Sequence, residues 1–179
     1  MTQQTSSSTR TSLLGRPGGL AVFAALSAGA AAGGAIVGKP KNRLWYRLVR
    51  KSELTPPDAT FGVVWPVLYG LGAWSAWRVA RTPSSPARTA ALALWGAQLA
   101  CNAAWTPVFF GAHRPRLALG VLVANAALLG AYALVASRVD GKAAAAVVPN
   151  LAWLGFAGVL NTAVVTKNAH GPTKLLARG

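Results

Sequence analysis

Three apolar segments of the chain carry tryptophans, other aromatic residues and amides at helical spacing. In the first segment an aromatic residue recurs at every fourth position, which places the rings on one face of a helix. In the other two, a tryptophan shares a helical face with amides one or two turns away. Because an amide is costly in hydrocarbon, we expect these faces to point toward protein or a cavity. The residues are Phe61, Trp65 and Tyr69, then Gln98, Asn102 and Trp105, and finally Trp153 and Asn161.

The rest of the chain offers little for catalysis. There are 3 Asp and Glu residues and 2 His residues, and all of them fall outside the apolar segments. A proton-coupled transporter needs an ionisable group within a span, and a hydrolytic triad needs an acid beside a histidine. The single cysteine, Cys101, permits no disulfide within the chain and fits no zinc pattern. We therefore expect no catalytic group of these kinds and no metal site.

A basic segment precedes the first aromatic face. Trp45 and Tyr46 begin it, Lys51 follows, and Pro56 and Pro57 stiffen the approach to the next helix. Aromatic rings stack on flat apolar groups, and lysine or arginine bonds anionic ones. We interpret this segment as the cover of a site for a flat, apolar, anionic ligand, with the three faces as walls. The competing interpretation is that the aromatic residues and amides only pack the helices together.

Composition indicates that the helices holding these faces lie in a membrane. Apolar residues make up 53% of the chain and charged residues 12%, about half the usual share of a soluble protein. The 18 Lys and Arg are segregated between apolar runs, so we attribute the net charge of +15 to loops beside anionic lipid headgroups, not to nucleic-acid binding. The predicted fold is all-α, an integral membrane bundle of five transmembrane helices over residues 20–38, 60–80, 89–110, 117–137 and 143–166.

The two ends of the chain are predicted to be tails. Residues 1–19, rich in Ser, Thr and Gly, are expected to be disordered, and residues 169–179 form a basic tail. The first apolar segment also resembles a secretory signal peptide, although it is longer than a signal core and close to the length of a span. More Lys and Arg lie in the first loop, the third loop and the C-terminal tail than on the opposite side. This predicts a cytoplasmic C-terminus and an N-terminus outside.

Four blocks of sequence follow a known family pattern in the correct order and spacing. They are Trp45-Tyr46 with Lys51 and Pro56-Pro57; Phe61, Val64, Trp65, Leu68 and Tyr69; Gln98, Leu99, Asn102, Trp105, Phe109 and Phe110; and Pro149, Leu151, Trp153, Phe156, Ala157, Leu160 and Asn161. Over about Leu20 to Asn168 the chain thus resembles the tryptophan-rich sensory protein/translocator protein family (TspO/MBR), also called the peripheral benzodiazepine receptor family. It departs from the pattern at Ser52, Leu54 and Asn150, which alters the expected lid and one wall.

This resemblance implies a five-helix membrane protein, often a homodimer, with porphyrins such as protoporphyrin and isoquinoline- or benzodiazepine-like drugs as ligands. It implies no obligatory cofactor. The expected partners are the lipid bilayer, the porphyrin or other flat apolar ligand, and a second copy of the chain. By position, the pocket would include Trp45, Tyr46, Trp65, Gln98, Asn102 and Trp153, with Phe61, Tyr69, Trp105 and Asn161 as supports and Lys51 among the cations that meet the propionates.

Three functions stay open at this point. The favoured one is a receptor, carrier or sensor that binds tetrapyrroles. The second is a light-dependent porphyrin-degrading enzyme, in which Trp65 and Trp153 would be the redox participants. The third is a helix bundle that organises partner proteins through close-packing glycine faces.

Overall fold

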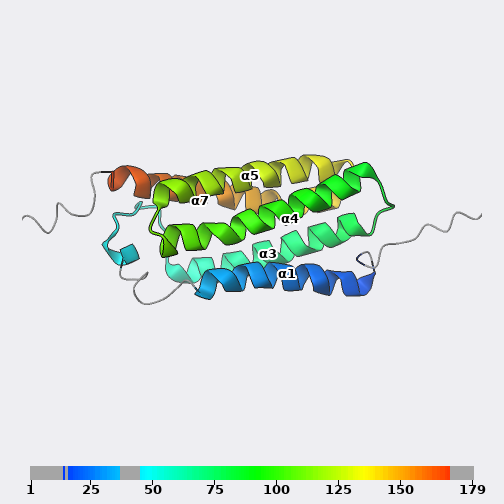
Figure 1. Cartoon of the computed structure of the whole chain (residues 1–179), viewed down its shortest axis with the longest axis horizontal. Helices are drawn as coiled ribbons and strands as arrows, with labels where there is room; N and C mark the ends of the chain where they lie inside the picture. Colours follow the sequence, from blue (N-terminus) through cyan, green and yellow to red (C-terminus); the bar gives the residue numbers. More distant parts are fainter. Residues whose placement is uncertain (1–13, 15, 37–44, 170–179) are drawn as a thin grey trace, which may run out of the picture.

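The computed structural model describes residues 14, 16–36 and 45–169, and the regular structure within these ranges is helical throughout. The long helices lie side by side in an elongated bundle, with α1 and α3 along one side, α5 and α7 along the other, and α4 between them (Figure 1). This confirms the all-α prediction. The elements are α1 Pro17–Ile36, α3 Asp58–Ala80, α4 Pro86–Thr106, the π-helix η2 Pro107–Gly111, α5 Pro115–Ser137, α6 Gly141–Ala146 and α7 Val148–Lys167.

The observed helices follow the predicted segments, with one division that the sequence reading missed. The predicted span 143–166 is divided into α6 and α7 near Pro149. Proline has no N–H to donate to the carbonyl of Ala145, so the helical ladder breaks there. The Val147 N–H instead closes α6 on the Ala144 carbonyl at 3.3 Å. Most of the predicted tails, residues 1–19 and 169–179, lies outside the described residues.

A second proline shapes the turn between α4 and α5. Pro107 opens η2, whose wider ring is closed by a bond from the Ala112 N–H to the Pro107 carbonyl at 2.8 Å. The next residue, His113, has a φ of 54°, a left-handed conformation that is uncommon for a residue with a side chain. This conformation reverses the chain direction, and α5 then begins at Pro115.

Side-chain caps begin two other helices where the sequence requires them. The Ser85 hydroxyl accepts a hydrogen bond from the Arg88 N–H at 3.1 Å, and Pro86 follows at the first position of α4. Asp140 caps α6 in the same way, accepting from the Ala143 N–H at 3.0 Å. Both caps lie at the end of the bundle where α3 ends.

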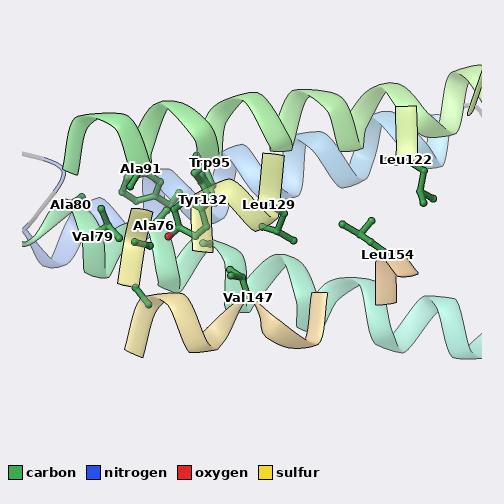
Figure 2. Packing of buried hydrophobic residues seen from close by; sticks show 14 residues of the cluster. Ala76, Val79, Ala80, Ala91, Trp95, Leu122, Leu129, Tyr132, Val147 and Leu154 are labelled. Atoms are coloured by element: carbon green, nitrogen blue, oxygen red, sulfur yellow. The ribbon is translucent and has the colours of Figure 1, made fainter. Parts of the chain in front are cut away.

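The packed core is densest at this same end of the bundle. Figure 2 shows Ala76, Ala91, Trp95 and Tyr132 gathered there from α3, α4 and α5. Alanines at these contacts let the helices approach closely, as in other membrane bundles. The Ser75 hydroxyl completes the contact, bonding the Tyr132 hydroxyl at 2.6 Å and donating to the carbonyl of α6 residue Ala143 at 2.7 Å.

Large apolar side chains also face outward. α5 and the α6–α7 segment are each long and apolar enough to cross a membrane, and residues Gly18–Ala32 form a shorter apolar helix. Exposed apolar side chains occur along several helices, which suits contact with lipid and not with water. Examples are Val22 and Leu26 on α1, Val63 and Val67 on α3, Val123 and Leu134 on α5, and Val148 and Val159 on α7.

Candidate ligand-binding site

A small cavity lies among α3, α4, α5 and α7. Its volume is ≈ 20 Å³, space for about one water molecule. Figure 2 shows Leu122 and Leu154 extending into the space between their helices, apart from the core residues Trp95 and Tyr132. A pocket for a drug-sized ligand measures roughly 300–1,000 Å³, so the described conformation is a closed one. The lining residues are Trp65, Asn102, Trp105, Leu122, Asn125, Leu154 and Ala157.

Aromatic rings form the wall between α3 and α7. The Trp65 and Trp153 rings meet edge to face with centroids 6.4 Å apart, and Phe61 contacts Trp153 in the same way at 5.7 Å. Tyr69 lies against Trp65 at 5.8 Å. The backbones of the two helices make few close contacts, so these rings span most of the distance between them. The structure thus brings together the predicted aromatic face of α3 and the tryptophan of α7.

A second aromatic cluster, which we call the roof, consists of Trp45, Tyr46, Phe109, Phe110 and His113. The Trp45 ring stacks on His113 at 4.5 Å, and the Tyr46 ring meets Phe110 edge to face at 5.2 Å. The Lys51 ammonium lies 4.4 Å from the centre of the Tyr46 ring. Burial raises the pKa of the Tyr46 hydroxyl, and the nearby charge of Asp58 raises it further. The first loop is therefore packed on η2 and on the turn that follows it.

The buried amides divide into two groups. Gln98 and Asn102 are 4% and 7% exposed on α4, as expected for amides that face protein, and Asn102 lines the cavity. Asn161, 2% exposed, lies apart from the cavity lining. In the orientation that satisfies both partners, its amide donates to the Pro115 carbonyl at 3.1 Å and accepts from the Leu119 N–H at 3.0 Å. Asn161 thus joins α7 to the start of α5.

Trp105 connects the roof to the cavity. Its ring lines the cavity and stacks on Phe109 with centroids 4.9 Å apart and 15° between the ring planes. Phe109 in turn contacts Trp45 edge to face at 5.6 Å. A continuous set of aromatic contacts therefore runs from the first loop to the centre of the bundle.

The sequence reading missed Asn125 as a site residue. This side chain is 2% exposed on α5 and lines the cavity. It is a lone amide in an apolar segment, with no second polar residue at helical spacing to mark a functional face. Only the packing of α5 against the other helices places it beside Asn102 and Trp105 in the lining.

The first loop is also fastened to the end of α7. The Asn168 amide accepts a hydrogen bond from the Arg50 N–H at 3.1 Å and donates one to the Arg50 carbonyl at 2.9 Å. The Lys167 ammonium donates to the Lys51 carbonyl at 3.2 Å. We call these three bonds the Asn168 clamp. No local pattern predicts it, because the paired residues are more than a hundred positions apart.

The polar groups of the site suit binding more than acid–base chemistry. Around the cavity they are the amides Asn102 and Asn125 and the indoles Trp65 and Trp105, none of which titrates near neutral pH. Within the described residues, no three His, Cys, Asp or Glu side chains gather in the way that a metal site requires.

Comparison with known proteins agrees with this architecture. Residues 21–166 match the model of the TspO/MBR family. The chain is 37% identical over 127 residues to a translocator protein of Sus scrofa, covering 69% of this chain and 75% of that protein. It is 37% identical over 123 residues to the protein CrtK of Rhodobacter capsulatus (67% and 76% covered) and 36% identical over 128 residues to a tryptophan-rich sensory protein of Cereibacter sphaeroides (72% and 79%).

The family match covers α3, α4 and α5, nearly all of α1 and α7, and both aromatic clusters. It identifies the bundle as that of a membrane protein with a receptor or sensor role, and the outward-facing apolar side chains agree with a lipid environment. The chain belongs to the TspO/MBR family.

Proposed function

We propose that the chain is an integral membrane receptor or carrier that binds porphyrins and related flat apolar ligands between α3, α4 and α7, beneath the first loop. The observation that carries the proposal is the convergence of Trp65 and Trp105 with buried amides on one cavity, with Trp153 closing its side. Enclosed apolar pockets with a few polar groups are typical ligand sites. The names of the similar proteins, translocator and tryptophan-rich sensory protein, are in keeping with such a role.

Ligand entry requires the closed site to open. The rings of Trp65 and Trp153 occupy the space between α3 and α7 that a flat ligand would take. An edge-to-face pair of this kind contributes about 0.5–1.5 kcal/mol, which stacking on a porphyrin plate can replace. Because side chains fill this space, the two indoles would have to rotate for a flat ligand to enter.

The cations at the same end of the bundle suit the anionic edge of a porphyrin. Lys51 lies on the Tyr46 ring, and the Asn168 clamp brings Arg50 and Lys167 close to it. Lysine and arginine form charge-assisted hydrogen bonds with carboxylates. The two propionates of protoporphyrin would therefore face the first loop, while the apolar plate enters the bundle.

The proposal includes five membrane crossings and a homodimer. The crossings would be α1, α3, α4 with η2, α5, and the α6–α7 segment, with the C-terminus in the cytoplasm. The first loop, the turn at His113 and the end of α7 contact one another, so they lie at one end of the bundle. At the other end, the Trp77 indole donates to the Arg16 carbonyl, and Arg78 pairs with Asp140.

The test is a titration of the detergent-solubilised protein with protoporphyrin, in the dark and then under illumination. We expect saturable quenching of tryptophan fluorescence at micromolar ligand, with the porphyrin absorbance unchanged in light. Absence of saturable quenching would contradict the proposal. Protein-dependent loss of porphyrin absorbance under illumination would support the degradative alternative instead.

A further inference from the structure

Two polar atoms at the cavity differ from those of the Ser75–Tyr132 contact in the dense core. In the core, the Ser75 hydroxyl bonds both the Tyr132 hydroxyl and a carbonyl of α6. At the cavity, two lining side chains carry buried polar atoms that have no hydrogen-bond partner among the described residues. These atoms are the indole Nε1 of Trp105, which donates, and the amide Oδ1 of Asn125, which accepts.

Both groups are buried among apolar neighbours. Asn125 is 2% exposed, and Leu122 and Leu154 beside it are 6% and 1% exposed. Stacking on Phe109 fixes the plane of the Trp105 ring. A buried donor or acceptor without a partner is destabilising, so a ligand that excludes water from these two atoms without bonding them binds more weakly than one that bonds both.

We propose that the cavity is a polar subsite for one small uncharged group that accepts a hydrogen bond from Trp105 and donates one to Asn125. Its volume of ≈ 20 Å³ fits one water molecule or one hydroxyl group. Water fills the subsite in the ligand-free protein, and the hydroxyl of a planar aromatic ligand replaces it. The inference rests on the proposed function, because the ring of that ligand would lie between α3 and α7.

The lining determines which chemical class the subsite accepts. It contains no cationic residue, so a carboxylate placed there would be buried without a counter-charge. A purely apolar group would leave the Trp105 and Asn125 atoms unpaired, which is how a hydrogen-bonding site rejects an analogue without a hydroxyl. An uncharged group that both donates and accepts satisfies the site. Asn125 is therefore a specificity-determining residue.

The test compares β-naphthol with β-fluoronaphthalene, which has nearly the same shape but no donor. Binding is measured by tryptophan quenching and corrected for partition into detergent. The wild-type protein should prefer the naphthol by roughly tenfold, the value of one hydrogen bond with its partner otherwise unpaired. The Asn125→Leu variant should reduce this preference to within about twofold. Tyr132→Phe is the matched control, because it removes a buried polar group of α5 outside the cavity, and it should keep the preference.

A second measurement works on the wild-type protein alone. The Trp105 indole N–H resonance, assigned with a Trp105→Phe variant, should stay at a hydrogen-bonded position with the naphthol, and it should move upfield with the fluoro analogue, which displaces the water without replacing its bond. Equal binding of both probes, binding of neither, or a preference that survives in Asn125→Leu would overturn the subsite. If the two naphthalene probes bind equally or not at all while protoporphyrin still quenches the tryptophan fluorescence, the subsite is wrong and the proposed function stands. If protoporphyrin does not quench while the preference for the naphthol holds, the subsite stands and the porphyrin proposal is wrong.

Discussion

At the scale of single residues, the buried amides have different roles that their sequence contexts do not reveal. The amide of Asn161 is satisfied by two backbone groups of α5. That of Asn125 has an unpaired oxygen among the described residues and lines the cavity. The sequence predicted that amides face the interior, because hydrocarbon excludes them. It did not distinguish an amide that joins helices from one that faces a cavity, since this depends on what lies opposite.

This distinction predicts the effect of Asn161→Leu. The variant loses two interhelical hydrogen bonds, which contribute about 1–2 kcal/mol together in a membrane bundle. We expect the Tm to fall by about 2–8 °C. Differential scanning fluorimetry in detergent measures this, with Thr162→Leu as the control because Thr162 is the exposed neighbour on the same helix. An unchanged Tm for Asn161→Leu would show that these bonds contribute no stability.

At the scale of elements, the apolar runs predicted the helices within a few residues because prolines and charged residues bound them. Two features required three-dimensional contacts. The division of the fifth segment near Pro149 was missed, since a proline near the start of a span is also compatible with a continuous, kinked helix. The Asn168 clamp joins the first loop to α7 through an amide that no local motif singles out.

The Asn168 clamp predicts the accessibility of the first loop. Asn168→Ala removes two hydrogen bonds to the Arg50 backbone. Trypsin, which cleaves after Arg50 and Lys51, should then cut the loop roughly tenfold faster, because two lost bonds correspond to about 1–3 kcal/mol of local opening. Thr166→Ala is the control, since that hydroxyl bonds only carbonyls of its own helix. Equal cleavage rates in the two variants would mean that the clamp does not hold the loop.

The Arg78–Asp140 ion pair lies at the end of the bundle opposite the first loop, and it predicts a pH dependence of the stability. Burial alone would raise the pKa of the Asp140 carboxyl, but hydrogen bonds from Arg78 and the Ala143 N–H, with the Arg78 charge, hold it below the ordinary value of 3.8. Its contribution to stability is therefore fully present above that value and disappears as the pH falls through the lowered pKa.

Asp140→Asn is the variant that measures this contribution. Asparagine keeps the cap of α6 but loses the charge, so the Tm near pH 7 should fall by about 1–4 °C, in line with about 0.5–1 kcal/mol for an exposed or half-buried pair. The wild-type and variant Tm values should converge near pH 2. A Tm difference between the wild type and Asp140→Asn that stays constant across the pH range would show that the Asp140 carboxylate is not the source of the pH dependence.

At the scale of the whole molecule, the sequence predicted the walls of the site but not its closed state. Helical spacing placed Trp65, Asn102 and Trp105 toward the interior, where they line one cavity. It gave no indication that the Trp153 ring would fill the space between α3 and α7, because ring positions depend on how far apart the backbones lie. The amount of free volume is a property of the assembled bundle.

The central claim is that the tryptophans between α3 and α7 form the porphyrin site. The most direct measurement is the affinity for protoporphyrin, followed by porphyrin fluorescence in the dark, of a Trp65→Ala, Trp153→Ala double variant. Its control is a Trp74→Ala, Trp77→Ala double variant, which removes the same number of indoles from the other end of α3, where they contact Arg78 and Arg81. Loss of stacking worth about 0.5–1.5 kcal/mol per ring predicts an affinity roughly tenfold or more weaker for the first variant and unchanged for the control. Equal affinities in the two variants would contradict the account.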